Sequence, residues 1–152
     1  MISLDLYGDP IPQARARTVR RGGKSITYDP NAKLKEGYKW QIRSQFREEP
    51  LTVPVAMDVV FMMPIPKATS KSKTAAMLNG AIHHMKRPDV DNMLKLVSDV
   101  LNNLVFKDDS QIIEIRARKI YSSKPGTYIR IIPIENQTKQ TFEDEKNTRT
   151  GR

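Results

Sequence analysis

The sequence predicts a single α/β domain of the α+β kind, in which a small mixed β-sheet is packed by two main helices. The chain has 152 residues, which is enough for one domain with its own hydrophobic core. Short runs of alternating apolar and polar residues are typical of strands, and two longer stretches have apolar residues at helical spacing. We assign the domain to residues 1–134 and a polar tail to residues 135–152.

The chain begins with a strand at residues 2–7, where apolar and polar side chains alternate before a Gly-Asp-Pro turn. Residues 10–28 hold many basic side chains around two consecutive glycines, and we interpret them as a flexible basic loop. The next element is a helix that starts with Asp29 as N-cap and Pro30 in the first helical position. We expect this helix to run to about residue 49.

A central strand is expected over residues 52–63, which are apolar on both alternating faces. This pattern is typical of a strand inside a sheet that is covered on each side. A Pro-Ile-Pro sequence ends the strand, and the lysine-rich residues that follow are interpreted as a second mobile basic stretch up to Gly80.

The clearest amphipathic pattern starts at Val90 and predicts the second main helix. Its polar side carries Asp91, Lys95 and Asp99, because about 100° separates successive residues around a helix. The apolar positions that define the opposite side are Val90, Met93, Leu94, Val97, Val100, Leu101 and Leu104.

Two more strands complete the predicted sheet, one where apolar residues alternate at 113–118 and one at 127–134. A Ser-Ser-Lys-Pro-Gly turn separates them. The residues beyond 135 are polar and aperiodic, and we expect them to form a frayed tail.

The charge of the chain favours a polyanionic partner. The formal net charge is +9 with a pI near 9.9. Residues 135–152 carry four acidic and four basic side chains, so the excess lies entirely in residues 1–134. The absence of cysteine excludes disulfides and thiolate zinc sites. With no apolar span and no signal-like N-terminus, we expect a cytoplasmic, DNA-associated protein without a membrane partner.

Carboxylates are concentrated in one segment of this basic chain. Five of its seventeen acidic residues fall between positions 89 and 109. Clustered carboxylates repel one another unless a cation lies between them, which favours a divalent metal ion, and an acidic metal pocket in a basic protein favours phosphodiester chemistry. The five residues are Asp89, Asp91, Asp99, Asp108 and Asp109.

A plainer interpretation needs no metal ion. Asp89 would cap the helix N-terminus, and Asp91 and Asp99 would each form an ion pair with Lys95, one turn away. On these residues alone, capping and pairing are the simpler account. The chain could then be a non-catalytic, basic DNA-binding protein.

The downstream Asp-Asp pair favours the metal interpretation but poses a geometric problem. Asp109 follows the helix, and an intact helix would separate it from Asp91 by roughly 20 Å or more. A compact site requires a bend after Leu101 or a chain that folds back. The sequence leaves these possibilities open.

Residues 87–112 carry a motif with a characteristic spacing. It reads Arg-Pro-Asp-Val-Asp-Asn-Met-Leu-Lys, then Ser-Asp-Val-Leu-Asn, then Phe-Lys-Asp-Asp-Ser-Gln-Ile. A proline- and arginine-bearing loop after the first strand, a Pro-x-Pro-Lys stretch and a basic strand ending in Lys-Ile-Tyr flank it. This combination resembles the signature of the RusA family of Holliday-junction resolvases.

The resemblance implies a homodimeric endonuclease that cuts four-way DNA junctions symmetrically with Mg²⁺, for which Mn²⁺ can substitute. It implies that Asp89, Asp91 and Asp109 are catalytic, metal-binding carboxylates and that Lys95 is the essential basic residue. The three carboxylates would gather because the chain closes back on itself or because the dimer completes the pocket. Structural or secondary roles are expected for Asp99, Asp108 and His84.

Basic residues near the predicted strand ends are the expected phosphate contacts. Selectivity for four-way junctions over flaps or forks depends on dimer geometry rather than on a local motif, so a nuclease acting on other branched DNA stays an alternative. The expected nucleic-acid-binding residues are Arg15, Arg17, Lys67, Lys71, Lys73, Lys86 and Arg87.

Overall fold

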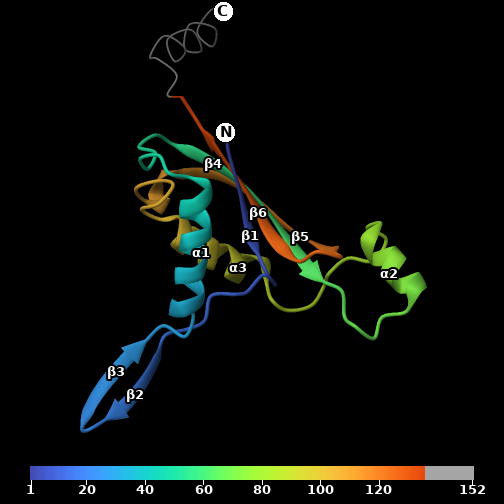
Figure 1. Cartoon of the computed structure of the whole chain (residues 1–152), viewed down its shortest axis with the longest axis horizontal. Helices are drawn as coiled ribbons and strands as arrows, with labels where there is room; N and C mark the ends of the chain where they lie inside the picture. The colour runs from blue at the N-terminus through green and yellow to red at the C-terminus, as the bar shows by residue number, and fades with distance from the viewer. Residues whose placement is uncertain (136–152) are drawn as a thin grey trace, which may run out of the picture.

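A four-stranded mixed sheet of order β1-β6-β4-β5 forms the centre of the computed structural model, which describes residues 1–135 (Figure 1). Strand β6 is antiparallel to β1 and β4, whereas β4 and β5 are parallel. The predicted α+β class and mixed sheet are confirmed. The strands are β1 (Ile2–Tyr7), β4 (Val55–Pro64), β5 (Ile112–Ser122) and β6 (Gly126–Pro133). The predicted tail lies outside the described residues, apart from Glu135.

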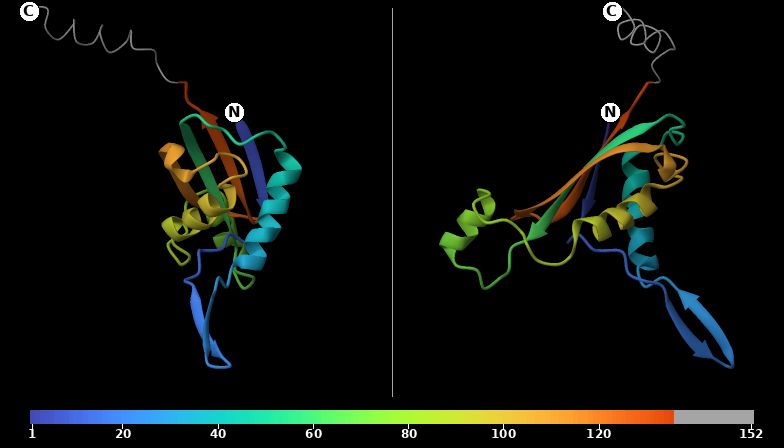
Figure 2. Two further views of the ribbon diagram at one scale, coloured as in Figure 1. Left: turned by 90° about the vertical axis from the view of Figure 1, so that its left-hand side faces the viewer. Right: turned by 180° about the vertical axis from the view of Figure 1, so that it is seen from behind.

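Two helices, α1 (Ala32–Gln45) and α3 (Val90–Leu101), cover the same face of this sheet (Figure 2). Alternate residues of β4 from Val55 to Met63 are buried beneath them, while the residues between are only half-buried. The expectation that β4 is covered on both sides is therefore wrong, because the helices pack on one face only. None of the helices in the described part of the chain is long and apolar enough to cross a membrane.

The start of α3 at Val90 agrees with the amphipathic pattern, and its apolar side lies in the core. Burying each such side chain contributes about 1.5–3 kcal/mol, so this face anchors the helix. The buried residues are Met93, Leu96, Val97, Val100 and Leu101.

Helix α1 is shorter than predicted. It begins at Ala32 because the Asp29 carboxylate accepts the Asn31 N–H at 2.8 Å and forms a turn before the helix.

The two segments expected to be mobile basic loops are ordered elements. Residues 10–28 contain a two-stranded antiparallel hairpin of β2 (Arg17–Arg21) and β3 (Lys24–Tyr28). Gly22 and Gly23 both have positive φ, 56° and 75°, which is the backbone of a tight type I′ hairpin turn. The glycines thus close a hairpin rather than confer flexibility.

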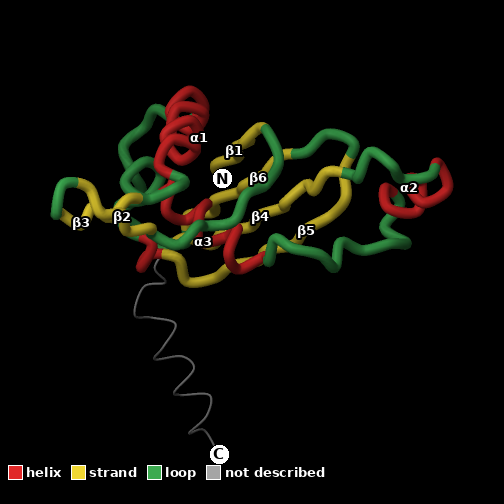
Figure 3. Tube along the Cα trace, turned by 90° about the horizontal axis from the view of Figure 1, so that it is seen from below, coloured by secondary structure: helices red, strands yellow, loops and turns green. Residues whose placement is uncertain are grey.

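The lysine-rich stretch after β4 contains α2 (Lys71–Leu78), with Ser70 as its N-cap. The Ser70 hydroxyl accepts the Lys73 N–H at 3.3 Å, and this cap starts a helix where the sequence predicts a mobile loop. Helix α2 and the hairpin project from opposite ends of the domain (Figures 1 and 3).

Candidate active site

Asp89 occupies the N-cap position of α3, but its side chain makes no capping hydrogen bond. Asp91 follows in the first turn, and both side chains are exposed. The plainer interpretation of Asp89 as a capping residue is therefore wrong. Its carboxylate is left available for another partner.

The segment that leads into Asp89 is fixed to the sheet by a single lysine of β5. The Lys119 ammonium donates hydrogen bonds to the carbonyl oxygens of Lys86 at 2.6 Å and Pro88 at 3.1 Å. These bonds hold the two residues on either side of Arg87. The main chain that presents Asp89 is consequently tied to β5.

The chain reverses direction directly after α3. Asn103 has a positive φ of 64°, and its N–H donates to the Phe106 carbonyl at 2.8 Å. Phe106 is fully buried and forms a parallel bridge with Leu51, which anchors the reversed segment beside the core. The folding-back required by the geometric argument is present.

A short 3₁₀ turn, η1 (Asp109–Gln111), then presents Asp109. Asp108 and Gln111 form a capping box, in which the Gln111 Oε1 accepts the Asp108 N–H at 2.9 Å. The Gln111 amide also donates to the carbonyls of Leu51 at 2.8 Å and Val53 at 2.9 Å. Gln111 therefore fixes the turn that carries Asp109 to the segment before β4.

As a result, a pocket of about 490 Å³ combines residues from both ends of the predicted site. Asp91, Asp99 and Asp109 line it together with Lys95. The approach of Asp91 and Asp109 to one pocket within a single chain resolves the spacing problem. The remaining lining residues are Gln13, Leu94, Ser98 and Ile115.

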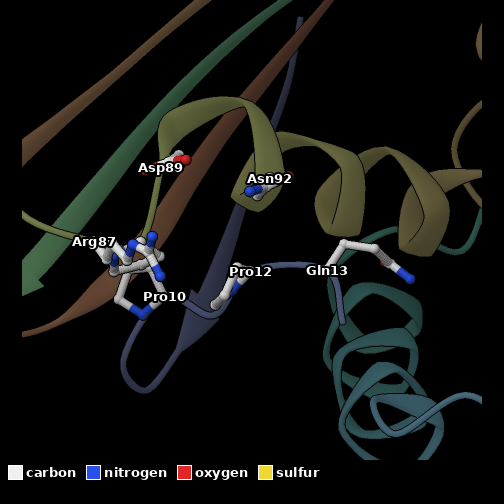
Figure 4. A pocket seen from close by; sticks show the side chains of 7 residues that line it. Pro10, Pro12, Gln13, Arg87, Asp89 and Asn92 are labelled. Carbon is white, nitrogen blue, oxygen red and sulfur yellow. The ribbon is translucent and has the colours of Figure 1, made fainter. Parts of the chain in front are cut away.

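Asp89 lines a neighbouring pocket with Arg87 and Asn92 (Figure 4). The Gln13 side chain contributes to both pockets. Its main-chain N–H donates to the Asn92 carbonyl at 3.0 Å, and its Oε1 is buried without a hydrogen-bond partner in the described structure. The structure thus divides the predicted carboxylates between two adjacent pockets that share one glutamine.

The ion pairs differ from those of the plainer interpretation. Asp99 pairs with Lys35 of α1 at 3.0 Å, and Lys35 also binds Asp29 at 2.6 Å. Within residues 1–135, neither Asp91 nor Lys95 forms a salt bridge. The Lys95 ammonium is therefore available to a ligand in the pocket, while Asp99 has a structural partner.

The residues of the pocket suit a hard divalent cation. Mg²⁺ prefers carboxylate oxygens and is often held by one or two of them, with water and substrate phosphate completing its shell. Asp91 and Asp109 can supply such a pair. Within residues 1–135 no three acidic or histidine side chains lie close enough together to hold one ion, so the single subunit does not form the predicted three-carboxylate set.

The secondary residues have identifiable local roles. Hydrogen bonds from the Ser110 hydroxyl and N–H lower the pKa of Asp108, consistent with a carboxylate that caps η1. Burial and the charges of Lys119 and Lys86 lower the pKa of His84. The His84 ring packs against Tyr121 with 5.0 Å between centroids. A neutral, packed imidazole favours a structural role for His84.

The expected phosphate contacts are exposed but lie on different elements. Arg15 precedes the hairpin and Arg17 begins it, whereas Lys86 and Arg87 lie just before α3. The remaining three are near or within α2, namely Lys67, Lys71 and Lys73.

A basic α+β domain has here, in one surface pocket, acidic side chains and a lysine without a salt bridge among the described residues. This is the make-up of a nuclease that works on a polyanionic backbone. The family model described as Endodeoxyribonuclease RusA matches residues 7–132, and the chain belongs to this endodeoxyribonuclease family. The chain is also 39% identical over 134 residues to the uncharacterized protein YqaN of Bacillus subtilis strain 168. That match covers 86% of this chain and 94% of the relative.

Three residues with clear structural parts in this region were not among the predicted site residues. They are Gln13, Gln111 and Lys119. Gln111 and Lys119 lie in or beside the motif. Their role depends on hydrogen bonds to carbonyls far away in the sequence, which no local pattern indicates. For Gln13, the only signal is its place in a proline-bearing loop.

Proposed function

We propose that the protein is a metal-dependent, structure-selective endodeoxyribonuclease that resolves four-way DNA junctions by paired symmetric nicks in recombination and repair. The observation that carries the proposal is the pocket that combines Asp91 and Asp109 with Lys95, which forms no salt bridge within residues 1–135, in a chain of the RusA family. The basic surface supplies the attraction to DNA.

In this proposal Asp91 and Asp109 would hold Mg²⁺, and Asp89 in the adjacent pocket would bind the ion through one of the waters that Mg²⁺ retains. Mn²⁺ can take its place. When bound, the ion polarises the scissile phosphate and lowers the pKa of an attacking water. Lys95 places its positive charge against the phosphate oxygens on which negative charge develops. Arg87, beside Asp89, binds the adjacent phosphate.

We also propose that the active form is a homodimer. One subunit offers one acidic pocket, and two symmetric nicks require two pockets related by a two-fold axis. The same symmetry fits a four-way junction, whose opposed strands are equivalent.

The test is cleavage of a labelled immobile four-way junction, with a linear duplex beside it, in EDTA and in Mg²⁺. We expect paired nicks on opposed strands of the junction in Mg²⁺ only. Asp91→Asn should abolish cleavage while junction binding stays equal or becomes tighter, because a negative charge near DNA is removed. Asp5→Asn removes the same charge from β1 and should cleave like the wild-type protein.

Other results would change the assignment. A shifted band without nicks in Mg²⁺ or Mn²⁺ would identify a non-catalytic DNA-binding protein. Cleavage of flaps or forks in preference to four-way junctions would identify those structures as the substrate instead. Wild-type cleavage by Asp91→Asn would remove the acidic pocket from the mechanism.

A further inference from the structure

The hairpin of β2 and β3, hereafter the ribbon, projects from the domain (Figure 1), and within residues 1–135 its strands make extensive contacts only with each other. All ten strand residues are exposed. An isolated two-stranded hairpin is marginally stable in water, so a ribbon of this kind gains from a partner that covers it. Its composition indicates what that partner is.

Residues 17–28 contain four basic side chains and no acidic one. The strand register pairs Arg17 with Tyr28, Val19 with Ile26 and Arg21 with Lys24. Because alternate residues of a strand share a face, these three pairs lie on one side of the ribbon. One face therefore interleaves three cations with three exposed apolar side chains.

Such a face suits DNA better than a second copy of this chain. Two ribbons placed face to face would bring like charges together, whereas phosphates attract them. A two-stranded β-ribbon has a width that the major groove of B-DNA admits. Strands of five residues extend about 17 Å, roughly half a helical turn of DNA.

The segments at the two ends of the ribbon, just before β2 and just after β3, are both bonded to α3 or to a residue that pairs with it. The Gln13 N–H donates to Asn92 of α3, and the Ala14 N–H donates to the Asn31 side chain at 2.5 Å. Directly after β3, Asp29 binds the Lys35 ammonium, which also pairs with Asp99 on α3. The direction of the ribbon is thereby set relative to Asp91.

We propose that the ribbon is a DNA-binding arm that grips one duplex arm of the substrate in its major groove, at a fixed distance from the scissile phosphate. This inference rests on the proposed function and deepens it, because it assigns double-helical DNA away from the branch point to a specific element. The ribbon binds duplex whether or not a branch is present.

The test measures binding in the Asp91→Asn background without added metal, as a function of salt. The variant Arg21→Gln/Lys24→Gln should bind both a junction and a linear duplex about tenfold or more weakly, and its log–log salt slope should fall by about two. The matched control, Arg47→Gln/Lys124→Gln, removes two exposed charges elsewhere and should bind normally.

A second measurement places the arm directly. Because the chain has no cysteine, Ser25→Cys at the ribbon tip provides a unique site for a photo-crosslinker. We expect crosslinks to duplex DNA several base pairs from the branch, and none from Ser44→Cys on α1. Crosslinks to a second protein chain, or a loss of dimer in light scattering for the ribbon variant, would overturn the inference.

The outcomes separate the two proposals. If the parent protein binds and cuts junctions but the ribbon variant keeps its affinity and salt slope, only the DNA-binding arm is refuted. A loss confined to junctions would also refute it. If the parent protein neither binds nor cuts DNA, the proposed function itself fails.

Discussion

The Lys119 ammonium donates a hydrogen bond to the carbonyl oxygen of Pro88 at 3.1 Å, one residue before Asp89. It also binds the Lys86 carbonyl at 2.6 Å. Hydrogen bonds from a charged donor are stronger than hydrogen bonds between neutral groups, and Lys119 makes two of them. This clamp joins strand β5 to the start of α3, so the main chain that carries Asp89 is fixed to the sheet.

We predict that Lys119→Met lowers the cleavage rate about 10- to 100-fold, because displacement of a reacting group by about 1 Å has an effect of that size. The measurement is single-turnover cleavage at saturating protein, which is insensitive to weaker binding. Lys124→Met, which removes a charge from the turn between β5 and β6, is the control and should cleave normally. An unchanged single-turnover rate for Lys119→Met would show that the clamp does not position the site.

Gln111 offers a second test of positioning. Gln111→Ala removes its bonds to Asp108, Leu51 and Val53 and should destabilise the protein by about 1–3 kcal/mol. Cleavage should also fall tenfold or more, because η1 carries Asp109.

The control for Gln111 is Gln45→Ala. Gln45 is the last residue of α1, and its side chain makes two comparable hydrogen bonds with the main chain of Asp5. It accepts the Asp5 N–H at 2.8 Å and donates to the Asp5 carbonyl at 2.7 Å. Its loss should affect the melting temperature but not the single-turnover rate. Equal effects of both variants on cleavage would mean that only global stability is being measured.

The sequence predicts the secondary structure best where one local signal decides it. Helix α3 starts at Val90, where an uninterrupted amphipathic pattern follows a proline. The hairpin could also have been found, since β-branched residues flank a Gly-Gly pair that forms a type I′ turn. A Gly-Gly pair between two such runs thus indicates a tight turn rather than a flexible loop.

The closure of the acidic pocket could not be predicted from local patterns. It depends on the bridge between Phe106 and Leu51 and on the anchoring of Gln111, contacts between segments that are more than fifty residues apart. Asp99 pairs with Lys35 rather than with the expected Lys95, and this contact too joins segments that are distant in the sequence. Helical spacing shows which side chains can meet within α3, but not that α1 supplies a cation.

The link between Lys35, Asp29 and Asp99 makes a prediction about pH. Hydrogen bonds from Lys35 and then from the Asn31 N–H lower the pKa of Asp29 below its ordinary 3.8. A depressed carboxyl pKa stabilises the folded state above the unfolded value and loses this effect as pH falls through the folded value. The stabilisation is thus fully present at neutral pH, begins to decline near pH 3.8 and is lost as the pH falls through the lower pKa of the folded state.

Lys35→Gln should therefore lower the melting temperature by about 3 °C at pH 7, with the difference shrinking as the pH drops below 4. Burial disfavours the charged Lys35 ammonium, but the bonds to Asp29 and Asp99 outweigh it and raise its pKa. The lysine consequently stays charged throughout this range. A difference that grows on acidification would contradict the assignment.

The position of Asp91 and Asp109 in one pocket of a single chain makes a prediction about mixed dimers. If each subunit holds a complete site, a dimer of one Asp91→Asn and one Asp109→Asn subunit has no intact site and should not cut. If the site were shared between subunits, the same dimer would retain one intact pair and would nick one strand. Mixed dimers purified through two different affinity tags distinguish these cases on a denaturing gel. A dimer of one wild-type and one Asp91→Asn subunit serves as the positive control and should nick a single strand, because only one of its two pockets keeps both carboxylates.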